Sequence, residues 1–534
     1  MGAVHEAIAA ATPDREALVF GDLRLTWADV AERSRRLANH LHGAGLGCHT
    51  ERSELAPWES GQDHLAIYCY NGNEYLESML GAFKARVAPF NVNYRYGPDE
   101  LAAVLADGEA RGIVYHSAFA PTVAAVRARL PRLELLLQVP GDSCHALLPG
   151  AVWYEDALAA ASPEPPPVVP SPDDLYILFT GGTTGRPKGV MWRQGDAFTE
   201  CFGGSRTATS IDDVVAAAST NLQALLAPPF MHGAGQWFGF LTWHTGGTIY
   251  LQHHPERLHP ADIWEIVERE RVTFLLVVGD AFARPLLDEL ERHPYDVSSL
   301  TVLLSGGAPL AEPLKQALLT HMPALMIVDG LGSSEAGGQL THVSTAGCAS
   351  TGTFALATDS VVLSEDRSRV LEPGDPELGW LAKSGRLALG YLGDAAKTSE
   401  TYPLVRGVRY AVPGDRARLR ADGTVELYGR EASTINSGGE KIFAEEVEAA
   451  VKAHPDVYDC VVAGRPSERW GSEVVAVVQL RDGLQPDPSA LRKAAATRLA
   501  RYKLPKAFVF VDEVVRSPSG KPDYRWAREV AARG

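Results

Sequence analysis

The stretch at residues 175–190 constrains the fold more than any other part of the chain. It reads LYILFTGGTTGRPKGV, so five bulky apolar residues are followed by four glycines, three threonines and one lysine. The apolar run predicts a buried strand. Glycines let the backbone approach an anion with its N–H groups pointing inward, while threonine hydroxyls and a lysine add donors and charge. This combination favours a phosphate-binding loop over a surface turn, in which glycine and threonine are also common.

The loop differs from a Walker A loop, because Pro187 precedes Lys188 and Gly189 follows it. It resembles the signature loop of the adenylate-forming enzymes, which include acyl-CoA synthetases, adenylation domains of peptide synthetases and luciferases. Their loop reads roughly [YF]-T-S-G-T-T-G-x-P-K-G, and here Gly181 stands at the serine. The resemblance covers essentially the whole chain except residues 48–63.

Four motifs sharpen the resemblance: TGGTTGRPKGVMW, GSSE, GREASTINSGGEKI and SPSGKPDYRW. Together they look like the actinobacterial FadD-type acyl-CoA synthetases, and among these like the branch that activates steroid side-chain acids. The resemblance implies an α/β fold with a large N-terminal adenylation domain and a smaller, mobile α+β domain that carries the catalytic lysine.

The pattern of apolar residues agrees with this architecture. Strand-like and helix-like segments alternate through the first 330 residues, which predicts parallel sheets covered by helices. Residues 379–415 read as a small β subdomain, and about 100 mixed α+β residues follow near residue 430. We therefore expect an N-terminal domain at residues 1–430 and a C-terminal domain at residues 431–534. Residues 48–63 are polar and irregular, and we interpret them as a surface insertion without an assigned role.

Composition limits the partners of the chain. A net charge of −16 over 534 residues argues against a general binder of nucleic acid or anionic membranes. No apolar run is long enough to cross a membrane, and the N-terminus does not read as a secretory signal. The six cysteines are scattered without metal-ligand spacing, which suits a reducing, cytoplasmic location.

Two further strands, at residues 300–304 and 326–328, are expected to end in small-residue loops at 305–309 and 329–335. Ligands of open α/β sheets bind beyond the carboxyl ends of such strands, so these loops and the loop at 180 could converge on one ligand. The motif positions and these loops together predict an ATP site formed by Thr180, Gly181, Gly182, Thr183, Thr184, Gly185, Lys188, Ser305, Gly306, Asp329, Gly330, Ser334, Asp415, Arg430, Lys441 and Lys521.

The resemblance also implies roles. The predicted catalytic residues are Lys521, Glu335, Thr183 and Lys188. Glu335 matches the glutamate assigned to Mg²⁺, and Asp415 and Arg430 match contacts to the ribose. Lys521 matches the mobile catalytic lysine that reaches the reacting acyl-phosphate oxygens. Leu331 stands where the family usually has a tyrosine that stacks on adenine, so we expect a different adenine pocket.

The acyl group is expected to lie against small and aromatic residues. The predicted acyl pocket comprises His232, Gly233, Gln236, Trp237, Gly306 and Gly307. The predicted CoA channel comprises Ser437, Gly438 and Gly439, where glycine would let a narrow pantetheine arm pass close to the backbone. The hinge position, usually Asp or Lys in the family, is Ala432 here.

The resulting hypothesis is an AMP-forming acid:CoA ligase that uses ATP, Mg²⁺ and CoA on a medium- or long-chain fatty acid or a steroid side-chain acid. A homodimer is a further expectation. Three alternatives stay open: a ligase that loads a carrier-protein phosphopantetheine, a degenerate paralogue that binds without turnover, and a luciferase-type oxidation. The presence of Lys188, Glu335, Asp415 and Lys521 disfavours the degenerate paralogue.

Overall fold

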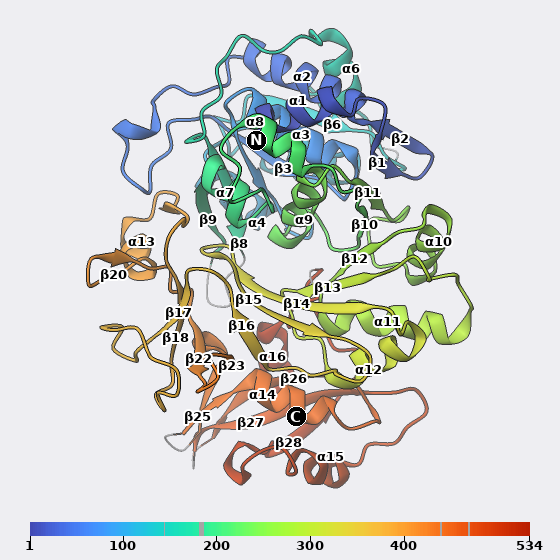
Figure 1. Ribbon diagram of the computed structural model, residues 1–534, viewed down its shortest axis with the longest axis vertical. Helices are drawn as coiled ribbons and strands as arrows, with labels where there is room; N and C mark the ends of the chain where they lie inside the picture. Colours follow the sequence, from blue (N-terminus) through green and yellow to red (C-terminus); the bar gives the residue numbers. More distant parts are fainter. Residues whose placement is uncertain (144, 181–185, 438–439, 468–469, 519, 534) are drawn as a thin grey trace.

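Two large sheets and a separate C-terminal unit build the molecule (Figure 1). The computed structural model describes residues 1–143, 145–180, 186–437, 440–467, 470–518 and 520–533. The sheets and helices below are those of these residues.

The first sheet has eight strands in the order β19-β9-β8-β4-β3-β5-β6-β7. From β8 to β7 all neighbours are parallel, whereas β9 and β19 are antiparallel additions at one edge. The strands are β3 (His64–Tyr68), β4 (Ala88–Asn91), β5 (Ala110–His116), β6 (Leu135–Val139), β7 (Val152–Trp153), β8 (Leu175–Thr180), β9 (Lys188–Arg193) and β19 (Gly390–Tyr391).

The second sheet has 13 strands in the order β17-β18-β22-β23-β16-β15-β14-β13-β12-β10-β11-β1-β2. Its strands are β1 (Glu16–Phe20), β2 (Leu23–Thr26), β10 (Gln223–Leu226), β11 (Thr248–Leu251), β12 (Phe274–Val277), β13 (Val302–Gly306), β14 (Met326–Ser333), β15 (Gly337–Ser344), β16 (Thr353–Leu356), β17 (Ser360–Leu363), β18 (Gly379–Lys383), β22 (Asp415–Leu419) and β23 (Val425–Arg430). A short hairpin, β20 (Leu404–Val405) and β21 (Val408–Arg409), lies apart from it.

Helices cover both sheets and fill the space between them (Figure 1). They are α1 (Gly2–Ala11), α2 (Trp27–Gly43), α3 (Asn73–Lys84), α4 (Pro98–Asp107), α5 (Ala120–Arg127), α6 (Tyr154–Ala160), α7 (Gln194–Glu200), α8 (Ile211–Ala217), α9 (Gly233–His244), α10 (Pro260–Glu270), α11 (Gly279–Arg292), α12 (Glu312–His321) and α13 (Ala395–Thr401), with short 3₁₀ turns η1 (Arg52–Glu54) and η2 (Ser117–Phe119).

The start of α2 shows how local sequence determines an element. The Thr26 hydroxyl accepts a hydrogen bond from Asp29 N at 3.1 Å, and the Asp29 carboxylate accepts one from Thr26 N at 2.8 Å. This reciprocal capping box satisfies two backbone donors that a helix N-terminus would leave unpaired. Val30, Leu37 and Leu41 follow at helical spacing and are fully buried. Local sequence therefore accounts for both the start and the buried face of this helix.

The predicted α/β fold is confirmed, and antiparallel strands at the edges make both large sheets mixed. The parallel strands form the centre of each sheet, and the predicted β subdomain extends the larger sheet through antiparallel neighbours instead of standing apart. The strand predicted to end at residue 328 continues to Ser333, because β15 pairs with it in a hairpin. A Cβ at Gly332 would lie 2.5 Å from the carbonyl oxygen of Gly337, so glycine allows this close pairing.

The C-terminal unit has its own apolar core. It contains η3 (Glu431–Ser433), β24 (Thr434–Ser437), β25 (Glu440–Phe443), α14 (Ala444–Lys452), β26 (Val457–Ser467), β27 (Gly471–Leu480), α15 (Pro488–Ala495), η4 (Arg501–Lys503), β28 (Ala507–Phe510) and α16 (Tyr524–Arg533). Its two buried clusters draw only on residues after 434. The predicted domain division near residue 430 stays a prediction.

A buried carboxyl group gives the C-terminal unit a pH-dependent stability. Glu448 is 4% exposed and accepts a hydrogen bond from Val462 N at 2.9 Å. Burial raises its pKa from 4.5 to about 7. The folded state therefore holds a proton that the unfolded state releases, so stability falls as the pH rises through this window.

Replacing Glu448 with glutamine should remove this loss and keep an acceptor for Val462. We expect Glu448→Gln to be more stable than the parent at about pH 8, by about 1–3 kcal/mol, and nearly equal to it at about pH 5. Thermal unfolding at the two pH values measures this. An equal difference at both values would contradict the assigned protonation.

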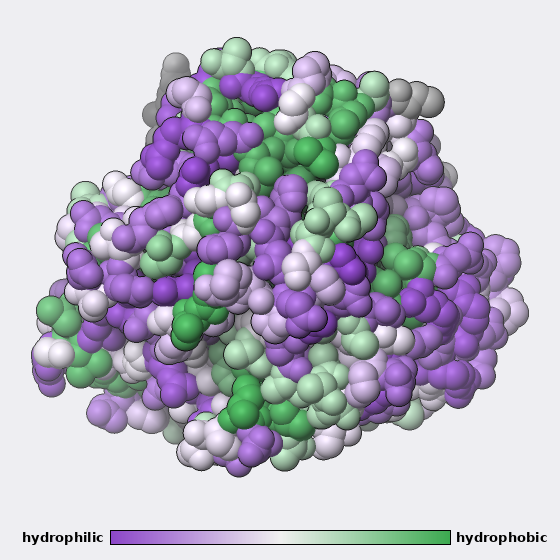
Figure 2. Space-filling model, turned by 90° about the horizontal axis from the view of Figure 1, so that it is seen from above, coloured by the Kyte–Doolittle hydropathy of each residue, from purple (hydrophilic) through white to green (hydrophobic). Residues whose placement is uncertain are grey.

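The face seen in Figure 2 carries hydrophilic residues over most of its area, with small apolar groups between them. Among the described residues, no helix combines the length and the apolar character needed to cross a bilayer.

Candidate active site

The glycine-rich loop joins two antiparallel strands. β8 ends at Thr180 and β9 begins at Lys188, and these two residues pair across the hairpin. Gly181, Gly182, Thr183, Thr184 and Gly185 lie outside the described residues. The Lys188 ammonium group forms an ion pair with Asp394, the N-cap of α13, and lies 6.0 Å from the centre of the Tyr391 ring.

One asparagine connects this hairpin to the segment before α9. The side chain of Asn91, at the end of β4, accepts a hydrogen bond from Phe179 N at 2.7 Å. Its amide group donates to Phe179 O at 2.9 Å and to Met231 O at 2.7 Å. Sequence reasoning missed Asn91, although a polar residue inside the apolar run APFNV was a visible signal.

Glu335 lies in the turn between β14 and β15 and is held from two sides. Its carboxylate accepts a hydrogen bond from the Tyr391 hydroxyl at 2.8 Å, and its carbonyl oxygen accepts one from the Tyr402 hydroxyl at 3.4 Å. Trp192 of β9 donates its indole N–H to Ser334 O at 2.7 Å. The two sheets thereby meet at this turn, where Tyr391 lies near Lys188 and donates to Glu335.

Asp415 and Arg430 face each other across β22 and β23. Their backbones are in register, and Arg430 Nε lies 3.4 Å from Asp415 Oδ1. Asp415 is 6% exposed, so its carboxylate is largely removed from water. The neighbouring carboxylate raises the pKa of the Arg430 guanidinium, so Arg430 stays positively charged.

Lys521 of the C-terminal unit reaches this group of charges. Lys521 is exposed to water, although protein atoms lie close enough to its ammonium group to affect its pKa. Burial and the positive charge of Arg430 lower its pKa, while Glu335 and Asp415 oppose that effect. A Cβ at Gly307 would lie 3.6 Å from Lys521 Cε, an ordinary van der Waals distance, so the two residues are neighbours. The predicted residues Glu335, Asp415, Arg430 and Lys521 thus share one site.

Two predicted ATP contacts use their side chains elsewhere. Ser305 is 2% exposed, and its hydroxyl accepts a hydrogen bond from Gly279 N at 3.0 Å. Asp329 forms an ion pair with the buried Lys315, at 2.5 Å between Nζ and Oδ2. Both side chains are therefore engaged within the protein. A ligand at these two positions would chiefly meet backbone atoms. Gly306 and Gly330 pair across β13 and β14 beside them.

The predicted acyl-pocket residues divide into two groups. His232 lies near Lys521, and its buried Nε2 has no hydrogen-bond partner in the described part of the chain. Burial, with Lys521 and Arg95 adding positive charge, lowers the pKa of His232 to about 3, so its ring is neutral. A Cβ at Gly233 would lie 2.9 Å from Leu178, which makes this a close contact between α9 and β8.

Gln236 and Trp237 belong to a buried hydrogen-bond network instead. Gln236 is 1% exposed and accepts from the Tyr176 hydroxyl at 2.6 Å, while its amide donates to Phe230 O at 2.7 Å and to the Tyr75 hydroxyl at 3.3 Å. Trp237 donates to the same Tyr176 hydroxyl at 3.3 Å. The Gln236 side chain is therefore engaged in the core.

Replacing Gln236 with leucine tests this placement. We expect Gln236→Leu to lower the free energy of unfolding by about 1–3 kcal/mol, because Tyr176 and Phe230 O lose their buried partner. The exposed Gln316→Leu on α12 is the control and should change stability little. Two properties are measured in the parent and in each variant: the unfolding temperature and the preference for the chain length of the acid. A changed preference with unchanged stability would instead place Gln236 in the acyl pocket.

The predicted CoA channel and the remaining ATP contact lie at the start of the C-terminal unit. Ser437 and Glu440 pair at the end of the β24–β25 hairpin, and Gly438 and Gly439 lie outside the described residues. The Lys441 ammonium group pairs with Glu431 at 2.6 Å. Residue 432 belongs to the 3₁₀ turn Glu431–Ser433 that joins the two units.

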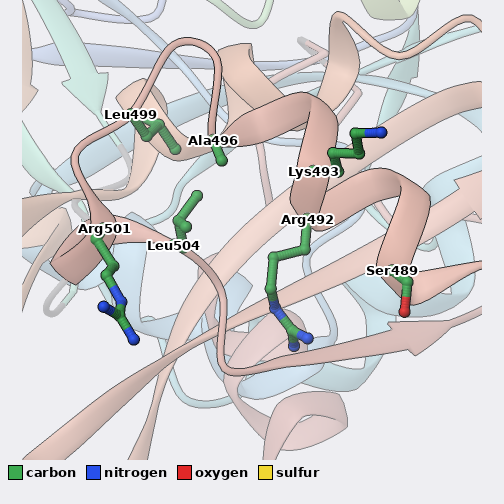
Figure 3. Close-up of a pocket in the computed structure, with 7 residues that line it drawn as sticks. All are labelled: Ser489, Arg492, Lys493, Ala496, Leu499, Arg501 and Leu504. Carbon is green, nitrogen blue, oxygen red and sulfur yellow. The ribbon is translucent and has the colours of Figure 1, made fainter.

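An open groove of about 530 Å³ lies away from these residues, beside α15 (Figure 3). It is lined by Ser489, Arg492, Lys493, Ala496, Leu499, Arg501 and Leu504. Arg492 uses its guanidinium group on Pro505 O and Lys506 O. This groove holds none of the residues that the sequence motifs predict.

The residues at the site fit Mg²⁺ bound chiefly through phosphate oxygens. In the described ranges no three His, Cys, Asp or Glu side chains gather into a metal cluster. Glu335 offers one oriented carboxylate, and Mg²⁺ in nucleotide sites is held by few carboxylates together with phosphates and waters. The Glu335 carboxylate, which lies within electrostatic reach of Lys521, is consistent with that arrangement.

Comparison with known proteins agrees with the geometry. The family model of the AMP-binding enzymes matches residues 5–392, and that of the AMP-binding enzyme C-terminal domain matches residues 446–521. The chain is 55% identical to the medium-chain acyl-CoA ligase Mig of Mycobacterium avium, over 100% of this chain and 98% of the relative. It is 38% identical to the 3-oxocholest-4-en-26-oate–CoA ligase of Rhodococcus rhodochrous, over 97% and 93%.

A third relative is the medium/long-chain-fatty-acid–CoA/3-oxocholest-4-en-26-oate–CoA ligase of Mycobacterium tuberculosis, which is 40% identical over 97% of this chain and 94% of its own.

Solved structures match the fold over almost the whole chain. The anthranilate CoA ligase AuaEII in complex with anthranoyl-AMP superposes with a TM-score of 0.82 at 20% identity, over 100% of this chain and 97% of the other. ATP-bound MatB from Rhodopseudomonas palustris superposes with a TM-score of 0.79 at 22% identity, over 98% of each chain. The chain belongs to the AMP-binding enzyme family and, within it, to the acyl-CoA ligases.

Proposed function

We propose that this enzyme activates a medium- or long-chain fatty acid, or a steroid side-chain acid, with ATP and transfers the acyl group to CoA. The observation that carries the proposal is the meeting of Lys521 with Glu335, Asp415 and Arg430, beside the half-buried His232. The substrate class follows the names of the three relatives above.

The first half-reaction joins two anions. A carboxylate oxygen of the acid attacks the α-phosphorus of ATP, the bond to the pyrophosphate oxygen breaks, and an acyl-adenylate forms. Positive charge near the developing charge lowers this barrier. We assign that charge to Lys521 from one side and to Lys188, released from Asp394, from the other.

The remaining residues would orient the nucleotide. A carboxylate accepts the two hydroxyl donors of a ribose well, and Asp415 is largely buried and held by Arg430. Glu335 would hold Mg²⁺, which when bound neutralises phosphate charge. Tyr391 and Tyr402 keep Glu335 in place before the nucleotide arrives.

In the second half-reaction the CoA sulfur attacks the adenylate carbonyl and AMP leaves. We assign the approach of the thiol to the β24–β25 hairpin at Ser437, while Gly438 and Gly439 stay predicted members of the channel outside the described residues. Movement of residues 431–534 about the turn at 431–433 would bring this hairpin to the site. The homodimer and the cytoplasmic location stay predictions.

Pyrophosphate release with ATP and Mg²⁺ tests the function. The acids range from acetate through long-chain fatty acids to aromatic and sterol-derived acids, each with and without CoA. CoA-dependent turnover on medium- to long-chain or steroid acids is the expected result. Pyrophosphate release without a CoA thioester would favour a carrier-protein acceptor, and no turnover with any acid would overturn the proposal.

A further inference from the structure

A buried ion pair connects the C-terminal unit to α11. Lys452 Nζ, at the end of α14, lies 2.7 Å from Asp280 Oδ2, and the two side chains are only 7% and 5% exposed. Burial disfavours charge on both groups, yet Lys452 holds the pKa of Asp280 below its usual value and Asp280 holds that of Lys452 above. The pair is therefore ionised inside the contact between the two units.

Asp280 is fixed to the N-terminal part of the molecule. It lies in the first turn of α11, and its second carboxylate oxygen accepts a hydrogen bond from Ala311 N at 2.7 Å. The preceding residue, Gly279, donates its N–H to Ser305 at the end of β13. This explains the buried Ser305 hydroxyl: it anchors the start of the helix that receives Lys452.

On the other side, Lys452 adjoins the groups that shape the Lys521 turn. Arg516 binds Asp459 with two hydrogen bonds of 2.6 and 2.7 Å and donates a third, at 3.0 Å, to Gly520 O. Asp459 stabilises the charged form of Lys452, whereas Arg516 opposes it, so the three charges are coupled. Arg516 thus connects the ion pair to the residue immediately before Lys521.

Further contacts of α11 with the C-terminal unit flank the pair. The Arg284 guanidinium group lies 5.3 Å from the centre of the Tyr458 ring, and the Tyr458 hydroxyl donates to Asp288 at 3.3 Å. A Cβ at Gly520 would lie 3.0 Å from Val278 O, just before α11. One helix therefore supports both α14 and the turn that ends in Lys521.

We propose that Asp280 and Lys452 are positioning residues for adenylation, which hold the turn before Lys521 against α11 so that its ammonium group stays beside Glu335 and Asp415. This inference rests on the proposed function, in which Lys521 acts in the first half-reaction. Neither residue touches a reacting atom. Their effect should be confined to the step that needs Lys521 in place.

The test measures the two half-reactions separately in Lys452→Met and Asp280→Asn. Adenylation is followed as single-turnover pyrophosphate release without CoA, and thioester formation is started from preformed acyl-adenylate and CoA. Each change leaves one buried charge unpaired, so we expect the adenylation rate to fall by about ten- to a hundredfold. The rate of thioester formation from the adenylate should change by less than about threefold, because Lys521 acts in the first half-reaction.

The double variant Asp280→Asn with Lys452→Met separates positioning from general instability. It removes both charges and keeps an acceptor for Ala311, so folding should recover while the ionic contact stays absent. We expect its unfolding temperature to approach that of the parent while adenylation stays reduced. Lys503→Met, which breaks the Lys503–Glu446 pair within the C-terminal unit, is the matched control and should leave both half-reactions unchanged.

Three results would overturn the inference: unchanged adenylation in the single variants, an equal loss in both half-reactions, or full recovery of adenylation in the double variant. Failure of the proposed function is a different result, because the parent enzyme itself would then be inactive in both assays.

Discussion

Lys521→Ala is expected to lower the rate of adenylation by about 10²- to 10³-fold, the usual effect of removing one preorganised donor from a developing negative charge. The lysine lies within electrostatic reach of Glu335, Asp415 and Arg430, and its Cε approaches Gly307. An alanine cannot supply the positive charge when the carboxylate meets the α-phosphate. Single-turnover pyrophosphate release measures the effect.

The matched control is Lys493→Ala, which removes a lysine of α15 that lines the separate groove of Figure 3. It should leave both half-reactions unchanged. Thioester formation from preformed acyl-adenylate should also persist in Lys521→Ala, since the adenylate is already made. Equal loss of both half-reactions would show that Lys521 supports the structure of the site instead of the first step.

Asp415→Asn is expected to lower kcat/KM for ATP by about 10- to 100-fold, in the range set by a hydrogen bond to a charged group. The substitution keeps the shape of the side chain but removes the anion that would accept two ribose hydroxyls. It also leaves Arg430 without its ionic partner at 3.4 Å. Initial rates over a range of ATP concentrations measure this loss.

Asp422→Asn serves as the control, because Asp422 is an exposed turn residue between the same two strands, β22 and β23. It should leave the kinetics with ATP unchanged. Replacing ATP with its 2′-deoxy or 3′-deoxy analogue should lower kcat/KM less in Asp415→Asn than in the parent enzyme. A constant loss with every nucleotide would contradict a ribose contact.

Local sequence was sufficient for most elements and for the family. The capping box at Thr26 and Asp29 lies within four residues, so the start of α2 needs no distant partner. The motifs around Lys188, Glu335, Asp415 and Lys521 identified the adenylate-forming chemistry, because each combines residue types that the chemistry needs. These are properties of short segments, which a sequence shows directly.

Errors arose where a distant partner decides the structure. The strand β14 runs past residue 328 because β15 pairs with it, and glycines that suggested a loop permit that close pairing. Strand direction is likewise set by neighbours in the sheet, so both sheets are mixed. Side-chain partners also come from distant parts of the chain: Gln236 contacts Tyr176, and Asp329 pairs with Lys315, while the predicted ligand contacts of Gln236 and Asp329 stay predictions.

The sequence by itself therefore determined the family, the order of elements and the residue types at the site. Only the tertiary structure decided which polar side chains are engaged in the core and which remain available at the candidate active site. The physical reason is that a buried polar group must find a partner, and that partner can come from any part of the chain. Lys452 pairs with Asp280, which lies 172 positions away in the sequence, so no local sequence pattern predicts this contact.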